Sequence, residues 1–381
     1  MFSSKRPLTR SVLFLFVLAS FVLVSCGTRG SDDNWPGLST DGENVYAAYG
    51  KRVIAYNVAD QRQLWLFPQE ASTALIYAAP SVNEDGRIIF GDYGASGGML
   101  NPKITTTIYA VENDTGSPPA TMWVNNTSAI GKTIAPALQV GDKVYVGSND
   151  STLIAMDATN GTELWRFEGA EEAIWGQPVY RGGMIYITSV DGVLYALDAN
   201  NGEEKWQYPL EGAIAGGVAL NDDLLYVADF ASHVHALSVA TGEEQWTAIA
   251  DDSTWATPAY ADGSVYFTDI SGTIYAVDGR TGDQLWRQTM PYPLQTSPLV
   301  SDGVVYVAGG PEGDASEGMI SAYAADSGEL VWQKVTTAPL NTTPVIVGDA
   351  VITIKQAAAV YSLVAFDIET GTEKWAHVLP E

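Results

Sequence analysis

The feature that most constrains this chain is a short repeated segment, seen clearly from Leu194 to Trp206. In it, Ala196 is followed by the turn pair Asn201-Gly202 and, ten positions after the alanine, by Trp206. The same spacing returns in six further copies, and one more copy, from Ala110 to Trp123, is stretched. Such repetition indicates copies of one supersecondary unit that stack on each other. The copies end at Trp65, Trp123, Trp165, Trp206, Trp246, Trp286, Trp332 and Trp375.

Each unit reads as four short strands separated by turn signals. A proline such as Pro258 marks the first strand, the β-branched and aromatic run Val265-Tyr266-Phe267 forms the second, and the third carries the recurring alanine. The fourth strand delivers the tryptophan, which we expect to pack against an adjacent unit. A period of roughly 40 to 46 residues suits a four-stranded propeller blade. We therefore predict an all-β fold, a single eight-bladed β-propeller of four-stranded antiparallel blades over residues 35–381.

The first residues have the pattern of an export signal rather than of a blade. Lys5, Arg6 and Arg10 precede an apolar run over residues 12–24, and Leu23-Val24-Ser25-Cys26 resembles a bacterial lipobox. We predict a lipoprotein signal peptide over residues 1–25, lipidation of Cys26, and a polar tether over residues 26–34. Because Cys26 is the only cysteine, the chain forms no intramolecular disulfide.

The charge of the chain limits the classes of partner. Its formal net charge is −26 at pH 7, and such a surface repels phosphate backbones, so we expect no nucleic-acid partner. We expect an exported monomer that meets a membrane through its lipid anchor.

The repeated unit, Ala-Leu-Asp-Ala-x-x-Gly-x-x-x-Trp around Ala196 and Trp206, carries a family resemblance. It resembles the tryptophan-docking, PQQ-like repeat of pyrroloquinoline-quinone enzymes and of their non-enzymatic relatives, the BamB lipoproteins of the outer-membrane β-barrel assembly machine. The resemblance covers residues 35–381. It implies a membrane-anchored scaffold that docks on the periplasmic domains of a barrel-assembly subunit. It also implies the periplasmic face of an outer membrane, or the outer face of the cytoplasmic membrane in a bacterium with a single membrane.

The resemblance leaves an enzymatic alternative open. Similarity to a quinoprotein dehydrogenase would imply an adjacent cysteine pair, a carboxylate base and a calcium site, whereas this chain has one cysteine. We therefore expect no catalytic residue and no cofactor. The alternatives are a small quinoprotein oxidoreductase that binds pyrroloquinoline quinone and a cell-surface module that binds a ligand or carbohydrate.

The histidines do not indicate a metal site in the sequence. His233 and His235 stand two apart on a predicted third strand, with His235 where other copies have Tyr195 and Tyr275. We interpret them as substitutions on a strand surface, because zinc and iron sites need three or more convergent ligands. His377 has no evident partner, and we expect no metal.

Several aromatic residues are not explained by the repeat. Tyr77, Trp175 and Trp255 each stand three residues before a proline that opens a blade, and Tyr292 lies in another such connection. In a four-stranded meander these crossovers share one face with the connections between second and third strands. The two largest insertions, over residues 91–107 and 309–318, fall in those connections. We predict an interaction face there; the alternative is that these aromatics fill the channel and pack under the loops.

The closure of the ring is left open by the sequence. The repeats begin with a first strand and end just after a fourth, so the last blade has no obvious strand to share with the first. The terminal blades would then pack side by side.

Overall fold

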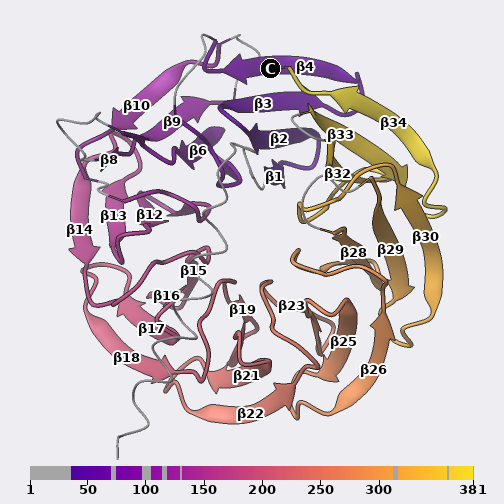
Figure 1. The fold of residues 1–381 in the computed structure, drawn as a ribbon. Coiled ribbons are helices and arrows are strands. Elements are labelled where there is room, and N and C mark those ends of the chain that lie inside the picture. Colours follow the sequence, from indigo (N-terminus) through magenta and orange to yellow (C-terminus); the bar gives the residue numbers. More distant parts are fainter. Residues whose placement is uncertain are drawn as a thin grey trace, which may run out of the picture. The chain divides into compact units, whose positions relative to one another are not determined.

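The structure is a computed structural model that describes residues 36–69, 74–96, 104–113, 118–128, 131–311, 316–357 and 360–380. The predicted signal peptide, Cys26, the tether and Trp35 lie outside these residues. Within the described residues, no helix is long and apolar enough to cross a membrane. Eight four-stranded antiparallel sheets stand radially around a channel (Figure 1). The predicted eight-bladed propeller is confirmed.

Each blade is built from strands that follow one another in the chain, from the channel outward. The first four blades contain β1 (Gly37–Thr40), β2 (Asn44–Tyr49), β3 (Arg52–Asn57) and β4 (Arg62–Phe67); β5 (Ser81–Val82), β6 (Arg87–Gly91), β9 (Ile108–Glu112) and β10 (Thr121–Asn125); β11 (Leu138–Val140), β12 (Lys143–Gly147), β13 (Leu153–Asp157) and β14 (Glu163–Phe167); and β15 (Val179–Arg181), β16 (Met184–Thr188), β17 (Val193–Asp198) and β18 (Glu204–Pro209). A small hairpin of β7 (Ala95–Ser96) and β8 (Ile104–Thr105) stands in the insertion of the second blade.

The other four blades repeat this order, and their described residues form no further sheet. They contain β19 (Ala219–Leu220), β20 (Leu224–Ala228), β21 (His233–Ser238) and β22 (Glu244–Ile249); β23 (Ala259–Ala261), β24 (Ser264–Thr268), β25 (Thr273–Asp278) and β26 (Gln284–Thr289); β27 (Leu299–Ser301), β28 (Val304–Gly309), β29 (Gly318–Ala324) and β30 (Leu330–Thr336); and β31 (Val345–Val347), β32 (Ala350–Ala357), β33 (Val360–Asp367) and β34 (Glu373–Val378).

The alanine and the tryptophan of each repeat are cross-strand partners. Ala196 on β17 lies opposite Trp206 on β18, and the register shifts directly after this pair; the same pairing and shift occur at Ala276 and Trp286. Because a bulge of this kind bends and twists the strand, it changes the direction of the outer strand beside the tryptophan. An alanine opposite leaves room for the indole, which explains why a small residue recurs there.

The tryptophan then packs on the turn of the next blade. The turn glycines have positive φ, and a Cβ built on Gly282 would lie 2.7 Å from the indole of Trp246. The indole N–H of Trp246 also donates to the carbonyl of Gly279, at 3.1 Å. Further copies of this docking place Trp123 on Gly161, Trp165 on Gly202, Trp206 on Gly242, Trp286 on Gly328 and Trp332 on Gly371. In blades 2 to 7 the repeat therefore fastens each blade to the blade that follows it.

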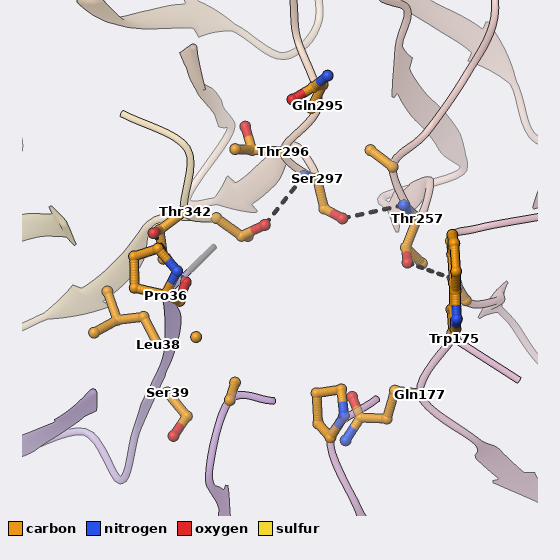
Figure 2. Close-up of a pocket in the computed structure, with 18 of the residues that line it drawn as sticks. Pro36, Leu38, Ser39, Trp175, Gln177, Thr257, Gln295, Thr296, Ser297 and Thr342 are labelled. Carbon is orange, nitrogen blue, oxygen red and sulfur yellow. Dashed lines mark hydrogen bonds between the residues drawn. The ribbon is translucent and has the colours of Figure 1, made fainter. Parts of the chain in front are cut away.

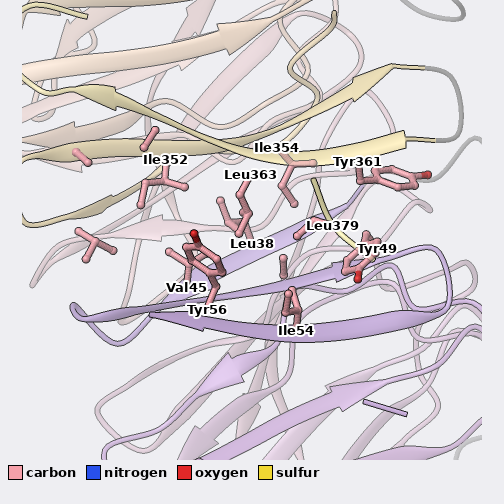
Figure 3. Close-up of a cluster of buried hydrophobic side chains, with 14 residues drawn as sticks. Leu38, Val45, Tyr49, Ile54, Tyr56, Ile352, Ile354, Tyr361, Leu363 and Leu379 are labelled. Atoms are coloured by element: carbon pink, nitrogen blue, oxygen red, sulfur yellow. The ribbon is translucent and has the colours of Figure 1, made fainter. Parts of the chain in front are cut away.

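The ring closes by side-by-side packing of the first and last blades. Each has all four of its own strands, and the space between them is filled by side chains of both, including Ile54, Ile352 and Leu363 (Figure 3). The phenol of Tyr49 donates to the carbonyl of Pro380 at 2.9 Å. This is the closure expected when no strand is shared.

The prolines lie slightly earlier than the sequence indicated. Pro178, Pro258 and Pro298 each precede the innermost strand by one residue rather than lying within it. Since proline has no N–H to donate, this position, where the chain enters the blade along the channel, leaves the ladder intact.

Candidate interaction face and central channel

The crossovers between blades and the second-to-third-strand turns lie on one face of the ring, which we call the crossover face. In the crossover between blades 3 and 4, the amide of Ile174 donates to Ser148 of the blade 3 turn, and the carbonyl of Ala173 accepts from Val190 of the blade 4 turn. The crossover thus binds both turns. The face is therefore a continuous surface held by backbone hydrogen bonds.

Trp175 and Trp255 both line the channel cavity on this face, and Figure 2 shows Trp175 beside it. Both are partly buried. The indole N–H of Trp175 donates to Asn149 Oδ1 at 2.9 Å, and the ring of Trp255 lies 4.9 Å from that of Phe230. Asn149 and Phe230 belong to second-to-third-strand turns, so each indole is oriented by the blade that precedes its crossover and keeps part of its surface in solvent.

Tyr77 and Tyr292 lie on the same face but away from the channel lining. The ring of Tyr77 meets the ring of Tyr93 edge-on at 4.6 Å, and the ammonium of Lys132 stands 3.9 Å from the Tyr93 ring. The phenol of Tyr292 donates to Glu317 Oε2 at 3.0 Å, and this carboxylate raises the pKa of Tyr292. The four predicted residues therefore share a face, and only the two tryptophans meet at one opening.

The channel holds a cavity of about 530 Å³. A chain of hydrogen bonds runs around it from blade to blade: Gly217 N to Thr257 Oγ1 at 2.7 Å, Thr257 N to Ser297 Oγ at 3.1 Å, and Ser297 N to Thr343 Oγ1 at 3.1 Å. We did not predict this chain from the sequence. The sequence does contain a pattern that matches this hydrogen-bond chain, since a serine or threonine stands directly before the proline at Thr257-Pro258, Ser297-Pro298 and Thr343-Pro344.

The channel residues do not fit pyrroloquinoline quinone. This cofactor carries carboxylates, which are bound in proteins by cationic side chains or by a metal ion. Among the described residues that line the cavity, none is charged; apart from the two tryptophans they are glycine, alanine, proline, leucine, valine, serine, threonine, asparagine and glutamine. Such a lining suits neutral polar groups.

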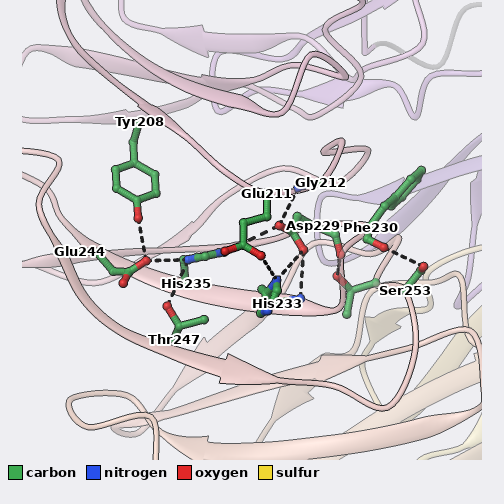
Figure 4. Close-up of polar contacts among 11 residues, drawn as sticks. Tyr208, Glu211, Gly212, Asp229, Phe230, His233, His235, Glu244, Thr247 and Ser253 are labelled. Carbon is green, nitrogen blue, oxygen red and sulfur yellow. Dashed lines mark hydrogen bonds and ion pairs between the residues drawn. The ribbon is translucent and has the colours of Figure 1, made fainter. Parts of the chain in front are cut away.

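The histidines differ from their interpretation as strand-surface residues. His235 is only 5% exposed and lies between blades 4 and 5, where its Nδ1 is 2.8 Å from Glu244 Oε2 (Figure 4). Burial lowers the pKa of His235, but Asp229 and Glu244 outweigh this effect and raise it. Asp229, His233 and His235 also converge within 4.8 Å. A third side chain of ligand type, which the sequence argument lacked, therefore lies beside the two histidines. His377 instead stacks at 4.7 Å on Tyr56 of the first blade.

The radial blades, the docking tryptophans and the uncharged channel define the chain as an eight-bladed propeller of PQQ-like repeats. A family model described as outer membrane protein assembly factor BamB matches residues 105–248, 206–287 and 230–381. Since these matches span well over half of the chain, the protein belongs to this family.

Solved structures agree on the fold. The crystal structure of BamB from Moraxella catarrhalis matches with a TM-score of 0.69 at 20% identity, over 88% of this chain and 97% of that one. The computationally designed Ika8 protein matches with a TM-score of 0.67 at 15% identity, over 91% of this chain and 95% of that one. No curated protein sequence matches this chain.

Proposed function

We propose that this protein is a non-catalytic scaffold of the cell envelope that binds a protein partner through the crossover face and takes part in outer-membrane protein assembly. Membership of the BamB family supports the assembly role. The observation that carries the binding face is the pair Trp175 and Trp255, held half-buried at one opening. Tryptophans of this kind are frequent anchors of protein interfaces because they bury a large rigid surface at small entropic cost.

The proposed attachment is a lipid on Cys26 after removal of residues 1–25. The lipobox-like Leu23-Val24-Ser25-Cys26 supports this step. Residues 26–34 would then reach at most about 30 Å, since an extended residue spans about 3.5 Å. The propeller would remain close to the membrane, at the periplasmic face of the outer membrane, where a barrel-assembly subunit presents its periplasmic domains. In a bacterium with a single membrane the anchor would lie in the outer face of the cytoplasmic membrane, without the assembly role.

The test is purification of the tagged full chain from gently solubilised membranes, with mass-spectrometric identification of the proteins that co-elute. We expect a barrel protein with periplasmic domains. The double variant Trp175→Ala/Trp255→Ala should lose it at least tenfold, since hot-spot truncations cost about 2 kcal/mol or more. Tyr180→Ala is the matched control: this aromatic is 40% exposed and stands beside the β15–β16 turn on the opposite face.

Two results would contradict the proposal. If no barrel protein co-elutes with the unchanged chain, the assembly role is wrong. If the partner is retained by the tryptophan variant and lost with Tyr180→Ala, the partner binds the opposite face. Circular dichroism of each variant checks that the propeller is intact.

A further inference from the structure

A cluster of ligand-type side chains lies on the crossover face at blade 5, apart from the channel (Figure 4). Asp229 follows β20, His233 and His235 lie on β21, and Glu211 comes from the crossover after β18. Asp229 is fully buried, His235 is 5% exposed, and the side chain of His233 is 21% exposed. The cluster is therefore inside the protein, with a route to solvent on the side of Glu211.

The spacing of the ligand atoms is close to that of a metal site. His233 Nδ1 lies 3.8 Å from Asp229 Oδ1 and 3.5 Å from Glu211 Oε2, and His235 Nε2 lies 3.7 Å from Asp229 Oδ2. Ligands bound at about 2.0–2.2 Å to a tetrahedral zinc ion are separated by roughly 3.4 Å. These contacts are too long for hydrogen bonds, and small side-chain movements would bring all four groups onto one ion.

Two buried nitrogens in this cluster have no hydrogen-bond partner. They are His233 Nδ1 and His235 Nε2, and both are directed at carboxylate oxygens. A buried polar atom left unpaired is costly, so such an atom calls for an explanation. An ion between the rings and the carboxylates would satisfy both nitrogens at once.

The surroundings hold the groups in a form suited to binding a metal. Glu244 Oε2 lies 2.8 Å from His235 Nδ1, so in the neutral ring this carboxylate holds the proton on Nδ1 and leaves the Nε2 lone pair for a ligand bond. Tyr208 donates to the same glutamate at 2.7 Å. The amides of His233 and Gly212 each donate to one oxygen of Asp229, at 2.9 and 3.0 Å, and fix the carboxylate.

The neighbouring blade shows what the same place contains without histidine. In blade 6, Tyr275 occupies the position of His235 in the strand register, and its phenol donates to Asp269 at 2.9 Å. Thr273 stands where blade 5 has His233. Blade 5 thus has, in place of a closed tyrosine–aspartate hydrogen bond, two imidazoles that each carry one unpaired nitrogen, His233 Nδ1 and His235 Nε2.

We propose that Asp229, His233 and His235, with Glu211 as the outermost ligand, bind one divalent transition-metal ion, for which zinc is the best fit. Two imidazoles with carboxylate oxygens form a ligand set that zinc accepts in tetrahedral geometry. Glu244 is a positioning residue that acts through His235. The ion joins β21 to the crossover from blade 4 and stiffens this part of the crossover face.

The test uses the detergent-solubilised full chain, purified through a histidine-free tag and stripped of metal. We expect one zinc ion per chain by elemental analysis and titration calorimetry, and cobalt(II) absorption bands of a tetrahedral site. His233→Thr/His235→Tyr copies the residues of blade 6 and should keep the fold while losing stoichiometric binding. Glu244→Gln should weaken binding about tenfold, whereas His377→Ala should leave it unchanged.

Absence of stoichiometric zinc and cobalt binding by the unchanged chain would overturn the proposal. Equal binding by the His233→Thr/His235→Tyr variant would also overturn it, because the ion would then lie elsewhere on this acidic surface. If the double variant does not fold, His233→Thr alone replaces it, with an expected loss of at least tenfold in affinity.

Discussion

At the scale of single residues, this propeller depends on contacts between a glycine and an indole. Gly282 combines φ +75° with direct contact to Trp246, so it is glycine for a conformational reason and for a steric one. Gly303, at φ +74°, has open space where its Cβ would be. The two positions differ in packing alone and allow the docking contact to be measured.

We predict that Gly282→Ala destabilises the protein more than Gly303→Ala does. Both changes incur the cost of an alanine in the left-handed region, about 1–2 kcal/mol, and only Gly282→Ala forces a Cβ into an indole, which adds about 1–3 kcal/mol. Urea unfolding of both variants measures the difference. Equal destabilisation would mean that the docked indole moves without cost.

At the scale of strands and blades, the structure explains how the ring closes without a shared strand. Leu379 follows β34 and is 4% exposed in the core between the first and last blades. Its amide donates to the carbonyl of Tyr361 at 2.8 Å. This hydrogen bond holds Leu379 within the last blade, and the last residues of the described chain close the ring by apolar packing and by the hydrogen bond from the Tyr49 phenol to the carbonyl of Pro380.

Leu379→Ala should accordingly cost about 2–5 kcal/mol of unfolding free energy, the range for removing a buried leucine. The adjacent Val378 is 63% exposed, and Val378→Ala should change stability by no more than about 0.5 kcal/mol. Denaturant titration monitored by tryptophan fluorescence compares the pair. Similar effects at both positions would show that closure does not depend on this contact.

At the scale of the whole molecule, each blade is a contiguous piece of chain. The terminal blades meet as other neighbours do, and only the covalent crossover between them is missing. A ring of this kind gains its stability from interfaces between neighbouring units rather than from any particular order of connection.

We therefore predict that a circular permutant folds. A short glycine–serine linker would join the two ends of the propeller, residues 36 and 380. The new ends would lie between Pro291 and Tyr292, in a crossover where Pro291 is exposed. Its melting temperature should stay within about 5 °C of the parent value. A permutant opened inside β25, between Ala276 and Val277, is the control and should not fold. Failure of the first permutant as well would show that blade order matters.

Local pattern was sufficient for the architecture and for part of the site. The alanine-to-tryptophan spacing, the turn pairs and the strand composition predicted eight blades, because a unit that cannot bury its own faces must stack on copies of itself. Chain direction alone placed Tyr77, Trp175, Trp255 and Tyr292 on one face, since antiparallel strands alternate in direction.

Only the tertiary structure showed which side chains from different blades come together. Asp229 stands only four residues before His233, but its approach to both imidazoles, together with Glu211 from the preceding crossover and Glu244 from β22, appears only in the folded chain. Likewise, only the assembled ring separated the two channel tryptophans from Tyr77 and Tyr292 and revealed the hydroxyl chain around the channel. Repeat spacing reports the period of a chain, whereas side-chain convergence depends on the distance and rotation between neighbouring blades, which packing decides.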